Sequence, residues 1–169
     1  MYWLTADEHY GHANILKFCK RPFDSVEEMD QALIDNHNER VSKNDTTIHA
    51  GDFTLKSKEF ATSIIKQLNG SHTFLKGSHD YWLPQNHKVR IEQKFNGYFI
   101  VIDHYCMRTW ARSHFNSIHL FGHSHNRLES VGKSMDIGVD TNNYYPYSLD
   151  EIINIMKTKP DNFNLVKRR

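Results

Sequence analysis

Five short runs of β-branched and aromatic residues are each followed at once by side chains that can bind a ligand, and this pattern constrains the fold most strongly. The runs are predicted strands at residues 3–6, 46–50, 73–76, 98–102 and 118–121. The groups that follow them are Asp7 and His9, Asp52, Ser78 with His79 and Asp80, His104, and His123 with His125. In open α/β sheets, ligands bind beyond the carboxyl ends of the strands. We therefore expect the five loops to converge on one site.

Helical patterns alternate with these strands. Helices are predicted at residues 26–41, 60–68 and 148–157 from their apolar faces and capping residues. The Asn96-Gly97 pair between residues 89–95 and 98–102 is a strong signal for a two-residue hairpin. The order predicts an α/β fold with an antiparallel element in its second half. The length of 169 residues favours a single domain over residues 1–169.

Composition and charge exclude several classes of protein. The chain has 21 basic and 20 acidic residues, a net charge of +1, and no basic stripe, so it lacks a strong nucleic-acid signature. No apolar run is long enough to span a bilayer, and the N-terminus leads directly into a polar cluster rather than a signal-peptide pattern. Cys19 and Cys106 are too few for a disulfide framework. We expect a cytoplasmic protein without a membrane partner.

The chain has 12 histidines, an unusually high number, and they are dispersed from His9 to His125 rather than gathered in a tract. Carboxylates and imidazoles without thiolates suit Mn, Fe, Zn, Co or Ni better than calcium or a structural zinc. Six donors would be enough for two ions about 3.5 Å apart, bridged by one carboxylate and a hydroxide. These donors are Asp7, His9, Asp52, His104, His123 and His125.

The sequence resembles the calcineurin-like metallophosphoesterase superfamily, whose pattern is D-x-H, GD, GNH(D/E), an isolated His and GHxH. The matching blocks, in order, are Asp7-Glu8-His9, Gly51-Asp52, Gly77-Ser78-His79-Asp80, His104 and Gly122-His123-Ser124-His125. Residues 9–15, 21–23 and 144–146 are similar to a small bacterial and phage branch of the superfamily. The resemblance covers nearly the whole chain. It implies a single-domain αββα sandwich with two central mixed β-sheets flanked by helices.

The resemblance also implies two divalent transition metal ions, with Mn favoured, and a role for each residue. One ion would be bound by Asp7, His9, Asp52 and His125, and the other by Asp52, Ser78, His104 and His123. Asp52 would bridge the ions, a metal-bridging hydroxide would be the nucleophile, and His79 would be the general acid. The implied reaction is hydrolysis of a phosphomonoester or phosphodiester in a small phosphorylated substrate, with nucleotides among the candidates.

Several residues near these blocks have two interpretations. His12 and Arg21 lie on the first connection, where they could clamp a substrate phosphate, and a structural role is the alternative for each. Asp80 is expected either to hold His79 in its useful tautomer or to cap the following turn. Because no cap domain is evident, the loops at residues 81–88 and 107–116 are predicted to select the substrate.

Ser78 departs from the family pattern, which has an Asn whose amide oxygen binds the second ion. A hydroxyl is shorter and a poorer ligand, so occupancy of the second site and the catalytic rate are both in question. A metal-binding scaffold without turnover is one alternative to an enzyme, although the presence of His79 and Asp52 argues against it. A nuclease is the other, and the low net charge argues against a long polymer substrate.

Overall fold

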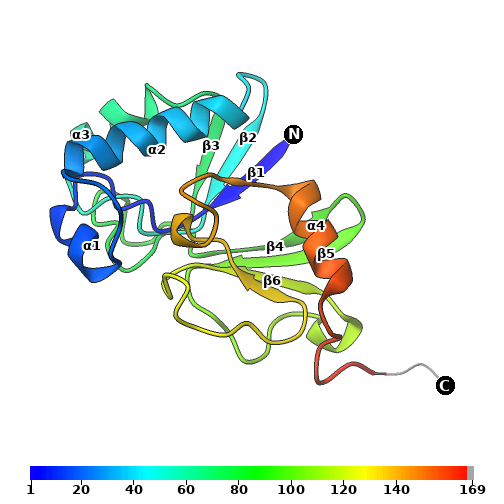
Figure 1. Cartoon of the computed structure of the whole chain (residues 1–169). Helices are drawn as coiled ribbons and strands as arrows, with labels where there is room; N and C mark the ends of the chain where they lie inside the picture. Colours follow the sequence, from blue (N-terminus) through cyan, green and yellow to red (C-terminus); the bar gives the residue numbers. More distant parts are fainter. Residues whose placement is uncertain (167–169) are drawn as a thin grey trace.

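Two four-stranded mixed sheets form the centre of the computed structural model, which describes residues 1–166 (Figure 1). Residues 167–169, at the end of the predicted domain, lie outside this description. The first sheet has the order β3-β2-β1-β8 and the second β4-β5-β6-β7. The strands are β1 (Tyr2–Thr5), β2 (Thr46–His49), β3 (Ser71–Phe74), β4 (Arg90–Phe95), β5 (Tyr98–Asp103), β6 (Ile118–Phe121), β7 (Ser134–Asp136) and β8 (Tyr147–Ser148). The expected mixed α/β sandwich is confirmed.

Within residues 1–166, four α-helices and two 3-10 helices accompany the sheets. They are α1 (Ala13–Phe18), α2 (Val26–Arg40), α3 (Lys58–Ile65), α4 (Leu149–Thr158), η1 (Ser113–Phe115) and η2 (Val139–Thr141). Helices α2 and α3 lie together on the outer side of the first sheet (Figure 1). Among the described residues, no helix is both long enough and apolar enough to cross a membrane.

The core has two parts, one on each side of the first sheet. Between the sheets, alternate residues such as Ile100 and Ile102 of β5 point inward and are fully buried, as the two-residue period of a strand requires. Helix α4 adds Ile152 and Met156 to this part. On the other side, α2 and α3 cover the first sheet through residues such as Met29 and Ile64. These layers hold the strand ends in place.

Parallel pairing brings the carboxyl ends of the strands to a common edge. β1 pairs in parallel with β2, and β2 with β3, while β5, β6 and β7 form a second parallel set. The two sets are tied together where they end: the His104 ring contacts the Ala50 carbonyl at 3.0 Å, and Val139 N donates to the Ala6 carbonyl at 3.0 Å. The predicted convergence of the loops therefore has a structural basis.

Local signals placed most elements correctly. The β4–β5 hairpin turns at Asn96 and Gly97, both with positive φ (46° and 86°), as a two-residue turn requires. Ser148 and Glu151 form a complete capping box at α4. Strand β3 begins at Ser71, two residues before the predicted start, because its pairing follows β2 from Thr46 onward.

Other boundaries differ from the sequence prediction. Helix α3 ends at Ile65 rather than at Leu68, because the next residues form tighter turns in which Gln67 N donates to the Ile64 carbonyl. Helix α1 and strands β7 and β8 were not predicted. Each is six residues or shorter, and the His12 side chain makes no cap hydrogen bond at α1.

Candidate metal centre

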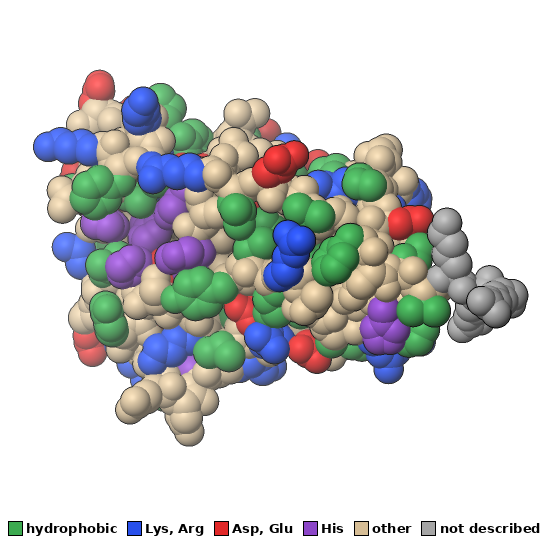
Figure 2. Space-filling model, turned by 90° about the horizontal axis from the view of Figure 1, so that it is seen from below, with side chains coloured by type: hydrophobic (Ala, Val, Ile, Leu, Met, Phe, Trp, Pro, Cys, Tyr) green, Lys and Arg blue, Asp and Glu red, His purple; other side chains and the backbone are tan. Residues whose placement is uncertain are grey.

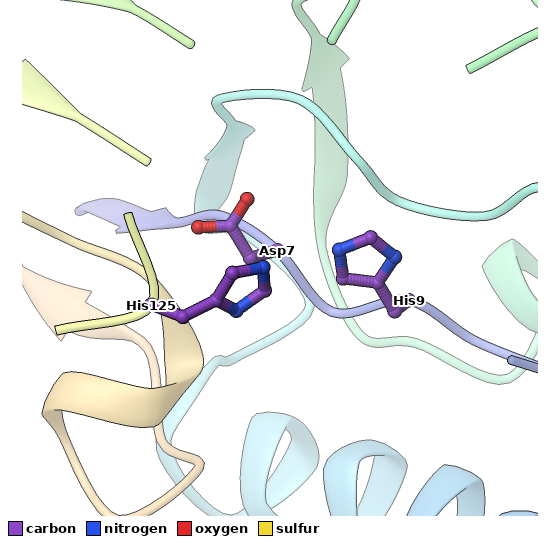
Figure 3. Close-up of side chains that lie close together, drawn as sticks. All are labelled: Asp7, His9 and His125. Carbon is purple, nitrogen blue, oxygen red and sulfur yellow. The ribbon is translucent and has the colours of Figure 1, made fainter. Parts of the chain in front are cut away.

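Two groups of histidine and aspartate side chains lie side by side at the carboxyl edge of the strands. Each group has three members whose ligand atoms all lie within 4.8 Å of one another. The first group is Asp7, His9 and His125, and the second is Asp52, His104 and His123. Figure 2 shows histidines gathered on one face of the molecule, and Figure 3 shows the first group in detail. The six donors predicted from the sequence thus lie in two neighbouring groups of three, whereas each predicted set has a fourth member, Asp52 in the first and Ser78 in the second.

Asp52 occupies the space between the groups. Its Oδ2 atom lies 3.3 Å from His104 Nε2 of its own group and 3.7 Å from His9 Nε2 of the other. The Nε2 atom of His79 lies 3.9 Å from the same oxygen. One carboxylate therefore faces both sets of imidazoles, which is the geometry expected of a bridging ligand.

The backbone at the proposed ligands is strained. Five residues of the two groups have positive φ: Asp7 (58°), His9 (55°), Asp52 (57°), His123 (66°) and His125 (47°). Non-glycine residues adopt this left-handed region rarely, and such strain persists at functional sites where the surrounding structure enforces it. This strain could not be predicted from the sequence, because the conformation belongs to the assembled loops.

Close approach explains two of the glycines in the motif blocks. Gly51 has a φ of +97°, and a Cβ there would lie 2.6 Å from His104 Nδ1. A Cβ at Gly77 would collide with Oδ1 of Asp52. Larger residues at either position would push the loops apart, so these glycines allow the proposed ligands to converge.

Three ring nitrogens at the centre are buried and have no hydrogen-bond partner within residues 1–166. They are His9 Nε2, His104 Nε2 and His79 Nδ1. Unpaired buried polar atoms are uncommon in folded proteins and require an explanation. Here two of them face the Asp52 carboxylate, a set of nitrogen and oxygen donors that suits a divalent transition metal ion. The residues present therefore fit the metal ions that the motifs imply.

Burial and neighbouring charges shift the pKa values of the side chains at the centre in opposite directions. Burial raises the pKa of Asp7 to about 7, and burial lowers the pKa of His9 to about 3. Burial alone would also lower the pKa of His104, but its contact with Asp52 and the charge of Asp7 outweigh this effect and raise the pKa to about 9. Burial opposes ionisation of Asp52, yet His104 and the His79 N–H hold its pKa below the usual value. In this electrostatic balance, positive charge on His104 compensates the buried carboxylates.

Ser78 and His79 both contact the central carboxylate. The Ser78 hydroxyl donates to Asp52 Oδ2 at 3.0 Å, and the His79 backbone N–H donates to Oδ1 at 2.8 Å. The His79 side chain is 39 % exposed, so its ring borders the open side of the site. The loop after β3 thus places a hydroxyl beside the carboxylate and an imidazole at the rim.

Neither predicted role of Asp80 describes its contacts. The Asp80 carboxylate accepts hydrogen bonds from the backbone N–H groups of Asp52, Phe53 and Gly77 and from the Trp82 ring. Within the described residues, no hydrogen bond joins it to the His79 ring. Asp80 therefore joins the loop of β2 to the loop of β3. Sequence position alone could not indicate this, since the partners lie up to 28 residues away.

The two predicted substrate contacts differ in location. His12 is partly exposed, and its ring lies 3.4 Å from His9 between the Nδ1 atoms, at the edge of the cavity. Arg21 is 4 % exposed and turns into the protein, where it binds Asp140. Its guanidinium does not reach the open side of the site, so its geometry agrees with the structural alternative. Asp140 was not identified from the sequence, because it belongs to none of the motif blocks.

A cavity of about 430 Å³ opens over the two groups. Besides the histidines and Asp52, it is lined by Ile15, Phe18 and Cys19 of the α1 region, by Leu55, and by Arg127. No residue from the loops at 81–88 or 107–116 is part of this lining. The unpredicted helix α1, rather than those loops, forms the wall of the cavity.

The fold and the site define a two-sheet α/β sandwich with adjacent His/Asp groups that could hold metal ions. The chain is 34% identical over 165 residues to the uncharacterized protein MJ1445 of Methanocaldococcus jannaschii, covering 92% of this chain and 90% of that protein. This chain therefore belongs to the same family as MJ1445. No family model matches it.

Solved structures show that the fold occurs elsewhere. The protein of unknown function AQ665 from Aquifex aeolicus is similar with a TM-score of 0.69 and 21% identity, covering 92% of this chain and 98% of that chain. A predicted phosphoesterase from Streptococcus pneumoniae is more distant, with a TM-score of 0.46 and 16% identity over 81% of this chain and 70% of that one. The first similarity establishes a shared fold, and the second is too distant to bear on function.

Proposed function

We propose that this protein is a metal-dependent hydrolase of phosphomonoester or phosphodiester bonds that uses two divalent ions. The observation that carries the proposal is the position of Asp52, whose Oδ2 lies 3.3 Å from His104 Nε2 and 3.7 Å from His9 Nε2. A carboxylate shared between two sets of ligands is the feature that distinguishes a two-ion site from a single-ion site. The resemblance of the motif blocks to the calcineurin-like metallophosphoesterases supports the same conclusion.

In this proposal the residues divide between metal binding and proton transfer. Asp7, His9, Asp52 and His125 would hold one ion, and Asp52, Ser78, His104 and His123 the other. When bound, the ions supply Lewis-acid charge and lower the pKa of water. His79, at the exposed rim, would protonate the leaving oxygen. Oxygen and nitrogen donors without a thiolate suit Mn, Fe, Zn, Co and Ni, and manganese is the favoured candidate among them.

The cavity supports a small phosphorylated substrate. Its volume of about 430 Å³ is in the range of small-molecule sites. Phe18 and Leu55 give one wall an apolar character, while His12 and Arg127 bring groups that can face a phosphate. An organic group joined to a phosphate would match both parts of this lining, and nucleotides belong to that class.

The proposal is tested with the full chain, purified and stripped of metal with a chelator. Elemental analysis of the untreated protein should find two transition metal ions per chain. Mn²⁺ added to the stripped protein should restore hydrolysis in a panel of phosphomonoesters, phosphodiesters, cyclic nucleotides and short DNA and RNA strands. Full turnover with metal shown to be absent would overturn the proposal. Two bound ions without hydrolysis of any substrate would favour a scaffold, and preferential cleavage of the strands would favour a nuclease.

A further inference from the structure

Asp140 connects a proposed metal ligand to a buried arginine. Its Oδ2 atom contacts His125 Nδ1 at 2.7 Å, and the same carboxylate accepts two hydrogen bonds from Arg21, at 2.9 Å from Nε and 2.8 Å from Nη2. Arg21 and Asp140 are 119 residues apart in the sequence. The side chain of Arg21 is fully buried, and that of Asp140 is 8% exposed. This chain of three side chains lies directly behind the first group of the metal centre.

The guanidinium of Arg21 has no donor left for a substrate. Besides the two bonds to Asp140, it donates to the carbonyl oxygens of Asp7 at 2.7 Å and Glu8 at 2.9 Å, and to the sulfur of Met29 at 3.4 Å. An arginine has five N–H groups in a rigid fork, and each of the five contacts uses one of them. Arg21 therefore holds the protein's own loops together.

A metal ion beside Asp140 is the competing interpretation. Cys19, His125 and Asp140 also have ligand atoms within 4.8 Å of one another. However, both carboxylate oxygens of Asp140 already accept from Arg21, whose positive charge lies 2.8 Å away and would repel a cation. Asp140 is better suited to bind a ring N–H than an ion.

We infer that Asp140, held by Arg21, is the positioning residue for His125: it accepts the Nδ1–H and leaves the Nε2 lone pair facing Asp7 and His9. Figure 3 shows one ring nitrogen of His125 turned toward Asp7 and the other turned away. A carboxylate behind a metal-binding histidine fixes both its tautomer and its ring orientation. The inference rests on the metal centre proposed above but is independent of any hydrolytic activity.

The same arginine also supports the opposite wall of the first group. Its bonds to the carbonyls of Asp7 and Glu8 hold the segment in which Asp7 and His9 have left-handed backbone conformations. Arg21 thus links the loop after β1 to Asp140, and through Asp140 to His125. The side chains of the first group would be in place before an ion binds. Metal binding would then not have to order these loops, which would otherwise weaken the affinity.

The first measurement uses the wild-type protein loaded with Zn²⁺, a diamagnetic probe, and long-range ¹H–¹⁵N NMR of the histidine rings. We expect a slowly exchanging proton on Nδ1 of His125 and the metal on Nε2. A metal on Nδ1, or a proton that exchanges with water as rapidly as that of an exposed ring, would overturn the inference. Because this measurement uses the wild-type protein, it tests the inference without depending on the folding of any variant.

The second measurement is calorimetric titration of metal-free protein with Mn²⁺. Asp140→Asn retains the side-chain volume and should weaken binding at the first group roughly 10- to 100-fold, the effect typical of an outer partner of a metal ligand. His123→Ala, in the second group, should weaken the other binding step and thereby identify each. Cys19→Ser is the matched control, because Cys19 neighbours both His125 and Asp140, and it should leave both steps unchanged.

Four results would contradict the inference. Asp140→Asn could leave both binding steps unchanged. It could also weaken both steps equally and lower the thermal stability of the metal-free protein, as the loss of a purely structural residue would. Cys19→Ser could weaken the first step as strongly as Asp140→Asn, which would move the ion to the Cys19 side. A wild-type protein that binds no Mn²⁺ would remove the proposed centre, and this inference with it.

Discussion

The carboxylate of Asp80 accepts a hydrogen bond of 2.7 Å from the backbone N–H of Asp52. Asp80 is 1 % exposed, and the same carboxylate also receives N–H groups from Phe53, Gly77 and Trp82. Several donors converging on one buried carboxylate fix the loop that carries the central aspartate of the site. Asp80 contributes to the geometry of the centre without facing the cavity.

Asp80→Asn should therefore destabilise the protein and loosen Asp52. An amide nitrogen in place of one oxygen leaves buried N–H donors unpaired, which costs about 1 to 3 kcal/mol for each group. Urea unfolding of the chelator-treated protein should show a lower free energy of unfolding than wild type. Asp24→Asn, at an exposed aspartate, is the matched control and should have little effect. Equal stability of both variants would contradict this account of Asp80.

Asp52→Asn should remove more metal than any other single change of a proposed ligand, because Asp52 is the candidate bridge for both ions. Its Oδ2 is the oxygen that His9 and His104 both face. Elemental analysis after dialysis measures the effect, with His123→Ala as the comparison in which one group alone is altered. Two ions retained at wild-type affinity in Asp52→Asn would exclude the bridging role.

His79→Ala should leave the metal content nearly unchanged and lower kcat by roughly 10²- to 10⁴-fold, as expected for the loss of a positioned proton donor. The ring is 39 % exposed and borders the cavity, where it can approach a leaving oxygen. The loss should be smaller for a nitrophenol ester, which needs little protonation, than for an alkyl ester. Equal losses for both would favour stabilisation of charge over proton transfer.

The loops of the site could be predicted from the sequence because their chemistry is local. Asp7, Asp52 and His104 each follow a strand with a clear apolar pattern, so their meeting at the sheet edge could be expected from parallel topology. The turn at Asn96-Gly97 is likewise determined by two adjacent residues.

The supporting contacts could not be predicted, because they join residues that are distant in the sequence. The bond between Arg21 and Asp140 exists only once η2 and the first connection are packed together. Helix α1 is also too short to show a periodic pattern, although it forms one wall of the cavity. The sequence for this reason left two roles open for Arg21, a clamp for a substrate phosphate and a structural role, and its contacts agree with the structural one.

Two neighbouring histidines away from the cavity, the buried His37 and the half-buried His72, should make the protein sensitive to acid. His37 is 4 % exposed and contacts the Asn69 carbonyl at 3.0 Å, and burial lowers its pKa from 6.5 to about 4. Burial similarly lowers the pKa of His72 to about 4. Between about pH 6.5 and pH 4, the unfolded chain therefore binds protons at these histidines more readily than the folded protein. Their contribution to stability should be fully present above about pH 6.5 and should be lost as the pH falls toward 4.

His37→Gln tests this pH dependence. Between pH 7.5 and pH 5, protonation of His37 alone should lower the free energy of unfolding of the wild-type protein by about 2 kcal/mol. This corresponds to about 1.4 kcal/mol for each pH unit below 6.5. In His37→Gln, the free energy of unfolding should fall less between the two pH values, by about 2 kcal/mol. Urea unfolding at the two pH values measures it, and His114→Gln, at an exposed histidine, should retain the wild-type difference. The same pH dependence in both variants would show that His37 does not titrate in this way.

Ser78 provides the sharpest test of the second group, because it stands where the family pattern has Asn. Its hydroxyl donates to Asp52 at 3.0 Å and 3.3 Å, so the side chain lies at the proposed bridge. An Asn side chain is one atom longer and would bring a carbonyl oxygen to the second ion. Ser78→Asn should therefore tighten that site and lower the Mn²⁺ concentration needed for half-maximal activity.

We expect the second binding step to tighten by a factor of about 10 to 100, by analogy with substitutions around other metal sites. The first step should change less, because Asp7, His9 and His125 are untouched. Calorimetric titration of both metal-free proteins with Mn²⁺ separates the two steps, and Ser78→Ala should weaken the second if the hydroxyl contributes. If the second binding step in Ser78→Asn is unchanged or weaker, residue 78 does not reach the ion, because a carbonyl oxygen placed at the ion should tighten that step.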